Sequence, residues 1–202
     1  DGAAANLDAE LPAWDADATY AAAQTAWRDR LAAVAITGGT IAERRIFYTS
    51  LYHAFLMPTL IGDLDGRYRL HGMATPSRAV GFTPMSDFSL WDTYRTVHPL
   101  YAWLAPTSAR DSTGSLAAFA ALGGCPRWPI AIGESGTMLG ASCDVVIADA
   151  VARGVPDHAA ALWPILRAAA VEATAPATGR GGRDQLEPYL QYGYVPSDIG
   201  RS

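Results

Sequence analysis

Hydrophobic positions recur with helical spacing in the first part of this chain. Ala23, Trp27, Leu31 and Val34 lie four, four and three residues apart, which is the spacing of one face of an α-helix. We therefore place a helix at about 20–34. A pair of glycines follows and is expected to end it, because glycine weakens a helix and favours turns.

A second stretch, at about 40–57, has a broader apolar stripe. Phe47, Leu51 and Phe55 recur at every fourth position, and neighbouring tyrosines widen the stripe beyond what a surface helix needs. Pro58 lacks a backbone N–H and cannot continue a helix, so we expect this helix to end there. The breadth of the stripe predicts that other elements cover this helix on two sides.

Helical patterns continue through the rest of the chain, separated by loops that are rich in glycine and proline. No strand-like alternation of apolar and polar residues interrupts them. Pro99 is expected to kink or divide the next helix, and Pro164 to bend a later one. The chain is therefore predicted to be all-α, with its chemistry on loops and helix starts. The predicted helices are 90–104, 112–122 (capped by Asp111 or Ser112), 138–153, 158–173 (capped by Asp157) and 185–192.

Two segments lack a helical period. Residues 1–18 are rich in Ala and Asp, and we expect a tail or linker there, followed by one helical domain over residues 19–202. Residues 71–86 contain two glycines and two prolines and are predicted to form a long loop. Loops of this length within a compact domain are often functional, so this one is suited to lining a pocket.

Composition narrows the class of protein. The chain has 202 residues, half of them hydrophobic, which is enough for one domain with its own core. Its net charge is −5, with no run of basic residues, so nothing favours nucleic acid or an anionic membrane as a partner. No apolar stretch reaches the length of a membrane span. The chain begins with Asp1 rather than Met, so we expect a processed chain or an excerpt.

The stretch 87–100 concentrates chemistry in a chain with few charges. Helical spacing places Trp91, Arg95 and His98 on one stripe and Asp92 beside Arg95. An indole ring suits the apolar face of a sugar, while a carboxylate and a guanidinium bind its hydroxyl groups. The alternative is a helix with core aromatics and an internal ion pair, and spacing alone leaves both interpretations open.

Other carboxylates have a structural and a functional interpretation as well. Glu134 follows Gly133 and precedes a predicted helix, so it is either a capping acid favoured by the helix dipole or an acid in a pocket. Asp63 and Asp65 belong to an Asp-Leu-Asp-Gly sequence that fails as an EF-hand, because its Gly comes too early and no closing Glu follows. That segment is either a turn or a sugar contact. The acid/base candidates are Asp63, Asp65, Asp87, Asp92 and Glu134.

Cysteine and histidine usage excludes several kinds of site. Cys125 and Cys143 lie outside any Cys-x-x-Cys pattern, and either a lone disulfide or two buried thiols is consistent with the sequence. The four histidines form no closely spaced pair, which argues against zinc. His53 lies among aromatic and apolar neighbours and is interpreted as a core residue. Acyl-transfer and nucleotide-binding motifs are absent from the sequence.

Several phrases of the chain, in order, resemble the glycoside hydrolase family 92 α-mannosidases. The phrase around Trp91 and Asp92 is long and specific, and the resemblance extends over about residues 20–198. The matching phrases are Ile46–Pro58, Asp63–Tyr68, Phe88–Leu100, Arg127–Pro129, Gly133–Gly140, Val146–Ala150 and Tyr192–Pro196.

The resemblance implies an inverting, calcium-dependent exo-mannosidase acting on terminal α-mannosides of N-glycans or mannans. It implies an incomplete (α/α)6 toroid, roughly the first half, and a secreted or periplasmic protein. Trp91 and Asp92 match contacts to the terminal mannose, and Arg95 and Glu134 are added as substrate-binding residues by their place in the matching phrases. The family's general acid and general base segments are absent from this chain, so we assign no catalytic residue and expect the calcium ligands outside it.

Two expectations follow from an incomplete toroid. The 202 residues alone are not expected to turn over substrate, and uncovered apolar helix faces are expected to cause poor solubility or oligomerisation. The alternative function is a non-catalytic helical module that binds carbohydrate or acts as a scaffold. The sequence that follows Ser202 in the parent reading frame would discriminate between the two.

Overall fold

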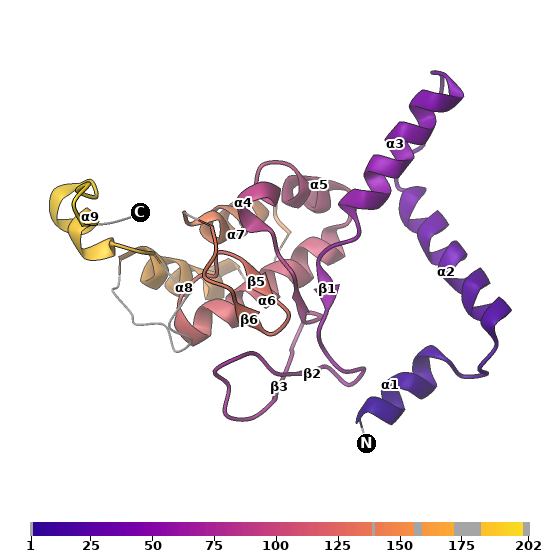
Figure 1. The fold of residues 1–202 in the computed structure, drawn as a ribbon, viewed down its shortest axis with the longest axis horizontal. Coiled ribbons are helices and arrows are strands. Elements are labelled where there is room, and N and C mark those ends of the chain that lie inside the picture. Colours follow the sequence, from indigo (N-terminus) through magenta and orange to yellow (C-terminus); the bar gives the residue numbers. More distant parts are fainter. Residues whose placement is uncertain (1, 139, 156–158, 172–182, 200–202) are drawn as a thin grey trace.

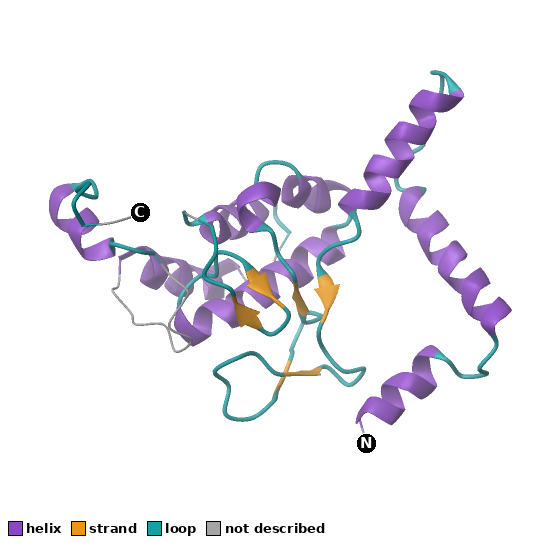
Figure 2. Cartoon of the chain, viewed as in Figure 1, coloured by secondary structure: helices purple, strands orange, loops and turns teal. Residues whose placement is uncertain are grey.

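The computed structural model describes residues 2–138, 140–155, 159–171 and 183–199. Most of these residues lie in helices (Figures 1 and 2), which confirms the all-α prediction. No helix in these ranges combines the length and apolarity needed to cross a membrane. The helices are α1 Gly2–Glu10, α2 Ala16–Leu31, α3 Ile41–Ala54, α4 Leu90–Thr93, α5 Val97–Leu104, α6 Pro106–Gly123, α7 Ser142–Ala152, α8 Ala159–Val171 and α9 Leu186–Tyr192.

In the part of the chain that the structure describes, three antiparallel strand pairs, each two residues long, connect the loops between the helices. Strand β1 pairs with β4, β2 with β3, and β5 with β6. These ladders are too short to produce the alternating pattern that marks a strand in sequence, which explains why sequence analysis missed them. The strands are β1 Thr59–Leu60, β2 Arg67–Tyr68, β3 Ser77–Arg78, β4 Met85–Ser86, β5 Pro129–Ile130 and β6 Gly133–Glu134.

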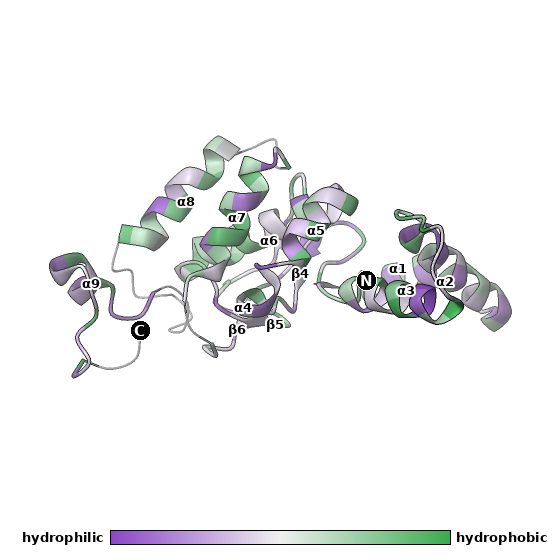
Figure 3. Cartoon of the chain, turned by 90° about the horizontal axis from the view of Figure 1, so that it is seen from above, coloured by the Kyte–Doolittle hydropathy of each residue, from purple (hydrophilic) through white to green (hydrophobic). Residues whose placement is uncertain are grey.

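Helices α1, α2 and α3 form an arm that projects from the rest of the molecule (Figures 1 and 3). Local capping explains where the two long helices begin. The Asp15 carboxylate accepts a hydrogen bond from the Ala18 N–H at 3.0 Å, and Thr40 and Glu43 form a reciprocal capping box at the start of α3. Both helices lie within about four residues of their predicted bounds.

The segment 1–18 contains ordered helical structure where the sequence indicated a tail or linker. Helix α1 occupies half of it, and α2 begins before it ends. Asn6 fixes α1 to the turn between β1 and β2, because its amide donates to Asp63 at 2.9 Å and accepts from the Leu64 N–H at 2.8 Å. The division into a tail and a domain over 19–202 stays a prediction.

The arm exposes much of its apolar surface. Trp27 and Tyr52 meet across α2 and α3 with ring centroids 4.4 Å apart, beside an open groove of about 690 Å³ between the two helices. Tyr101 ties the C-terminal end of α3 to α5, because its hydroxyl donates to the carbonyl of Ala54 and its ring stacks on Phe55. Of the α3 residues only Leu51 is buried, so the prediction that other elements cover this helix on two sides was wrong. The expected exposure of apolar helix faces is present, and the expected oligomerisation stays a prediction.

The core of the body forms around α6, which packs against α5, α7, α8 and β4. Leu90, Leu116, Cys143 and Ile147 are almost fully enclosed there. Gly114 is required where α6 passes Phe82, because a Cβ atom at that position would lie 2.5 Å from the Phe82 ring. Figure 3 shows that the more hydrophobic helices of the molecule, α7 and α8, belong to this body.

Two predicted helix starts were wrong. Helix α6 begins at Pro106, since proline fits the first position of a helix, where no N–H is needed. Asp111 therefore lies inside α6 and accepts from the Thr83 N–H at 3.1 Å instead of capping the helix. Helix α7 begins at Ser142 rather than near Met138. The proposed cap at Asp157 lies outside the described residues.

The predicted division of the helix over 90–104 is confirmed, although its position differs. The break falls at residues 94–96, between α4 and α5, and Pro99 occupies the first turn of α5. Proline is tolerated there because the first-turn N–H groups of a helix have no intrahelical partner. This break separates Trp91 and Arg95 from His98, so the single stripe predicted for these three residues does not form.

Candidate functional site

The β5–β6 hairpin is organised by a buried carboxylate. Glu134 is only 8% exposed, and its Oε2 atom accepts from the Arg127 N–H at 2.7 Å and the Trp128 N–H at 3.1 Å. Its Oε1 atom accepts from the Gly136 N–H at 2.8 Å. A carboxylate that collects several backbone N–H groups satisfies donors that a tight hairpin leaves without strand partners.

The sequence suggested that Glu134 is either a helix-capping acid or an acid in a pocket, and its contacts differ from both. It lies in β6 rather than at the start of a helix, so the capping interpretation was wrong. It is a buried acid, but backbone donors already occupy both of its oxygens. Its assignment as a substrate-binding residue stays a prediction, and the contacts give it a clear role in holding the hairpin.

The hairpin in turn holds the segment that precedes α4. The Asp87 Oδ1 atom accepts from the Ala131 N–H at 2.8 Å, and its Oδ2 atom accepts from the Thr59 hydroxyl. Next to it, the Phe88 N–H donates to the Pro129 carbonyl at 3.2 Å. Three segments that are distant in sequence thus meet at Asp87, whose φ of +62° is in the left-handed region. Sequence analysis counted Asp87 only as an acid/base candidate.

The predicted substrate-binding residues Trp91, Asp92 and Arg95 are all exposed around α4. Trp91 retains 41% of its surface, and the Arg95 guanidinium lies 4.1 Å from the centroid of its ring. Ser89 donates to the Asp92 Oδ2 atom at 2.6 Å. The internal Asp92–Arg95 ion pair of the alternative interpretation is not among the contacts of the described residues. Instead, Arg95 stacks between the rings of Trp91 and Tyr94.

This arrangement presents an aromatic ring, a cation and an anion on one accessible surface. Trp91 and Asp92 are both exposed, as contacts to a ligand require, and their role in sugar binding stays a prediction. Stacking on two aromatic rings limits the freedom of the Arg95 side chain. One Asp92 oxygen is held by Ser89, which fixes the direction in which the carboxylate faces.

His98 is a core residue. It is buried between Phe88 and Tyr101, with ring centroids 6.1 and 6.0 Å away. Burial lowers the pKa of His98 to about 4, against a smaller opposing effect of Asp149. The ring is therefore neutral at physiological pH and does not join Trp91 on the exposed surface.

The Asp63–Asp65 segment follows the turn interpretation. Asp65 accepts from the Arg67 N–H at 3.0 Å and forms ion pairs with Arg67 at 2.8 Å and Arg78 at 3.1 Å. The hydrogen bond from the Arg67 backbone is the main cause that lowers the pKa of Asp65. These contacts hold Asp65 against β2 and β3, while the Asp63 side chain accepts from Asn6 of α1.

The two cysteines form a disulfide, which decides between the two states that the sequence left open. Cys125 and Cys143 have Cα atoms 5.8 Å apart. Together with Asp144 they form the one cluster of three or more potential metal ligands among the described residues. Two sulfur atoms do not suit calcium, which prefers oxygen ligands. This cluster is therefore unsuited to calcium, and the calcium ligands expected outside this chain stay a prediction.

Comparisons with known proteins agree on one family. A sequence model of the glycosyl hydrolase family 92 catalytic domain matches residues 2–202. A curated relative from Arthroderma benhamiae, described as an uncharacterized secreted glycosidase, is 24% identical over 98% of this chain and 22% of its own length.

Solved structures show the same relationship. A family GH92 α-mannosidase from Bacteroides thetaiotaomicron is 28% identical, with a TM-score of 0.82 over 98% of this chain and 26% of that protein. The structure of the same mannosidase with mannoimidazole gives a TM-score of 0.83. An inverting GH92 mannosidase from the same organism is 27% identical, also with a TM-score of 0.83, over 98% of this chain and 27% of its own.

The chain thus spans about a quarter of the length of these relatives. Its helical fold matches a helical region of the GH92 structures across nearly all of its residues. Because the family model covers residues 2–202 and the structural similarity extends over the same region, the chain belongs to glycosyl hydrolase family 92.

Proposed function

We propose that this chain is part of an inverting exo-α-mannosidase and contributes to the site that binds the terminal mannose. The observation that supports this most is the 28% identity, over 98% of the chain, to a GH92 α-mannosidase whose structure is also known with mannoimidazole. The proposed substrates are terminal α-mannosides of N-glycans or mannans. Export from the cell belongs to the proposal too, supported by the relative described as secreted.

The exposed surface at α4 is the proposed mannose-binding part of this chain. Trp91 offers an accessible indole ring, on which the apolar face of a hexose stacks. The Asp92 carboxylate accepts hydrogen bonds from sugar hydroxyls, and the Arg95 guanidinium donates to them. In this proposal Glu134 acts as a positioning residue, since its carboxylate holds the hairpin on which the segment before α4 rests.

The proposed reaction is attack of water at the anomeric carbon while an acid protonates the leaving oxygen. Inversion requires two carboxyl groups about 6.5–9.5 Å apart, with space for the water between them. We assign neither group to this chain and propose that both, with the calcium ligands, come from other parts of the enzyme. The calcium requirement is tested by treating the longer enzyme with a calcium chelator, which should abolish its activity.

Mannoimidazole binding to the purified chain tests the proposal. Titration calorimetry should give saturable binding that is lost in Asp92→Ala and kept in Asp8→Ala, an exposed acid on α1 that serves as the matched control. The same sample should release no mannose from a terminal α-mannoside. Equal binding by the wild type and Asp92→Ala would contradict the assignment of the site. Sugar binding without hydrolysis, even by the longer protein, would favour a non-catalytic module.

A further inference from the structure

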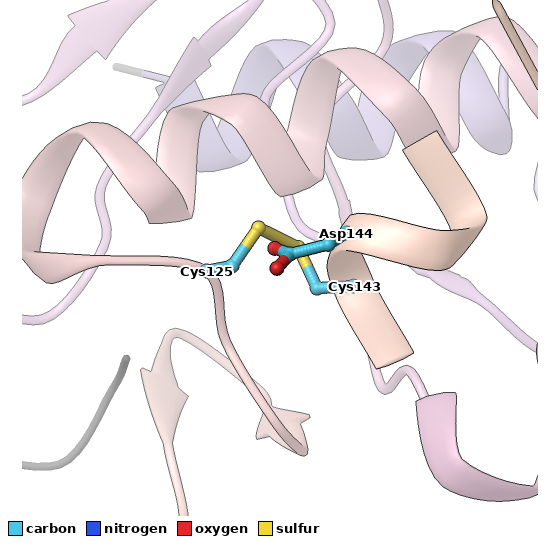
Figure 4. Close-up of side chains that lie close together, drawn as sticks. All are labelled: Cys125, Cys143 and Asp144. Carbon is cyan, nitrogen blue, oxygen red and sulfur yellow. A yellow bond between two sulfur atoms is a disulfide. The ribbon is translucent and has the colours of Figure 1, made fainter. Parts of the chain in front are cut away.

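A second cluster of polar and sulfur-containing side chains lies in the body, next to the core that also includes Leu90 of α4. Cys125 lies two residues after the end of α6, and Cys143 and Asp144 lie in the first turn of α7. Figure 4 shows the Asp144 carboxylate beside the disulfide. One donor atom from each of the three residues lies within 4.8 Å of the others. The two cysteines are only 5% and 0% exposed.

Asp144 has an unused acceptor in this cluster. Its Oδ2 atom accepts from Arg183, whereas its Oδ1 atom is buried and no donor among the described residues reaches it. Burial is the main cause that raises the pKa of Asp144, and the Arg183 contacts only partly oppose it. A buried carboxylate oxygen without a partner is unfavourable, and a cation at that point would relieve it.

We propose that the reduced Cys125–Cys143 pair, together with the Asp144 carboxylate, binds a thiophilic divalent cation such as Zn²⁺. Zinc binds both thiolate sulfur and carboxylate oxygen, and water can complete the tetrahedron where a site offers three protein ligands. The same sulfur atoms make the cluster unsuitable for calcium or magnesium. This site is independent of the proposed mannose-binding surface.

Conversion of the disulfide into the metal-binding form requires a dithiol reductant. The reductant supplies two electrons and two protons, the S–S bond breaks, two thiols form, and the reductant becomes a disulfide. Binding of the cation then displaces the two thiol protons to solvent. The two cysteines can therefore form the disulfide or bind the cation, but not both at once.

A cavity adjoins the Arg183 side chain that pairs with Asp144. It has a volume of about 150 Å³ and is lined by residues that include Arg127, Ala141 and Arg183. Arg183 both lines the cavity and pairs with Asp144, so displacement of its guanidinium opens the way to the carboxylate. Ala141, which also lines the cavity, is two residues before Cys143.

The metal would preserve a structural connection that reduction removes. The disulfide joins positions 18 residues apart, and the segment that it encloses contains the β5–β6 hairpin with Glu134. A cation held by the same two sulfur atoms closes the same loop. The reduced, metal-bound chain should therefore keep the hairpin in place.

Cobalt titration of the wild-type chain tests the proposal without a destabilising substitution. The protein is reduced with a phosphine, freed of reductant under anaerobic conditions and titrated with Co²⁺ alone. We expect one equivalent to bind with a sulfur-to-cobalt charge-transfer band, and Zn²⁺ to displace it. The oxidised protein should show no such band. Addition of Zn²⁺ should raise the Tm of the reduced protein, or restore its helical circular dichroism if reduction unfolds it.

Variants separate the contribution of each ligand. Asp144→Ala should weaken cobalt binding by about tenfold or more. Asp149→Ala is the matched control, because Asp149 lies on the same helix and pairs with Arg153 on the surface, and it should bind as the wild type does. A missing charge-transfer band in the reduced wild type would overturn the proposal. So would unchanged cobalt binding in either Cys143→Ser or Asp144→Ala.

Discussion

Replacement of Glu134 by alanine tests whether this acid organises the hairpin. The substitution removes the acceptor for the N–H groups of Arg127, Trp128 and Gly136, which donate over 2.7–3.2 Å. Each donor left without a partner costs about 1–3 kcal/mol. Because these N–H groups are only partly buried, we use the lower end, about 1 kcal/mol each, or about 3 kcal/mol in total.

Urea unfolding, followed by circular dichroism and by tryptophan fluorescence, measures this loss. Glu134→Ala should lower the free energy of unfolding by about 3 kcal/mol, a large part of the stability of a typical domain. Glu134→Gln should lose less, about 1 kcal/mol, because its amide oxygen still accepts on one side. Glu187→Ala is the matched control, since this acid is exposed on α9, and its effect should stay within about 0.5 kcal/mol.

The result also separates two roles for Glu134. A residue that only contacts substrate would change sugar binding and leave the unfolding free energy near that of the control. A stability change in Glu134→Ala as small as that in Glu187→Ala would therefore refute the argument from the hairpin. A large stability loss would confirm that the backbone donors depend on this carboxylate.

Three further predictions follow from the structure. Cys143→Ser should lower the free energy of unfolding by about 3 kcal/mol, because it opens the loop of 18 residues that Cys125 and Cys143 close; an unchanged urea midpoint would contradict this. His98 has a pKa of about 4 when folded and a reference value of 6.5, so the unfolded state binds the extra proton between these values. The contribution of the neutral His98 side chain to the free energy of unfolding is complete above about pH 6.5 and falls by about 3 kcal/mol as the pH drops to about 4. A His98→Phe variant should therefore lose less stability between pH 7 and pH 4.5. Gly114→Ala should destabilise the chain by about 1 kcal/mol net, because its Cβ would lie 2.5 and 2.7 Å from Cγ and Cβ of Phe82 and this strain exceeds the gain in helix propensity; thermal unfolding that matches the wild type would show that Phe82 moves aside.

Local sequence determined the two long helices of the arm well. Apolar spacing and the capping residues Thr40 and Glu43 act within a few positions of one another, so they are visible without a tertiary structure. The resemblance around Trp91 and Asp92 was sufficient to suggest the family, because a long phrase of matching residues is specific. The comparisons confirmed that family over nearly the whole chain.

Helix starts were less visible where tertiary contacts competed with local signals. Asp111 has the chemistry of a cap, yet the Thr83 N–H, 28 positions away, engages its carboxylate inside α6. Helix α4 ends after four residues, so the spacing that aligned Trp91 with His98 applied to a continuous helix that does not exist. A pattern of spacing assumes an unbroken element, and only packing reveals the break.

By itself, the sequence determined the helical class, the family and the residues with the chemistry to bind a sugar. Only the tertiary structure decided how those residues act. It placed Glu134 under the backbone donors of a hairpin, brought Cys125 and Cys143 together across 18 positions, and kept Trp91 at the surface while it enclosed His98. The physical reason is that helix formation depends mainly on neighbouring residues, whereas burial, pairing and pKa depend on segments that only folding brings into contact.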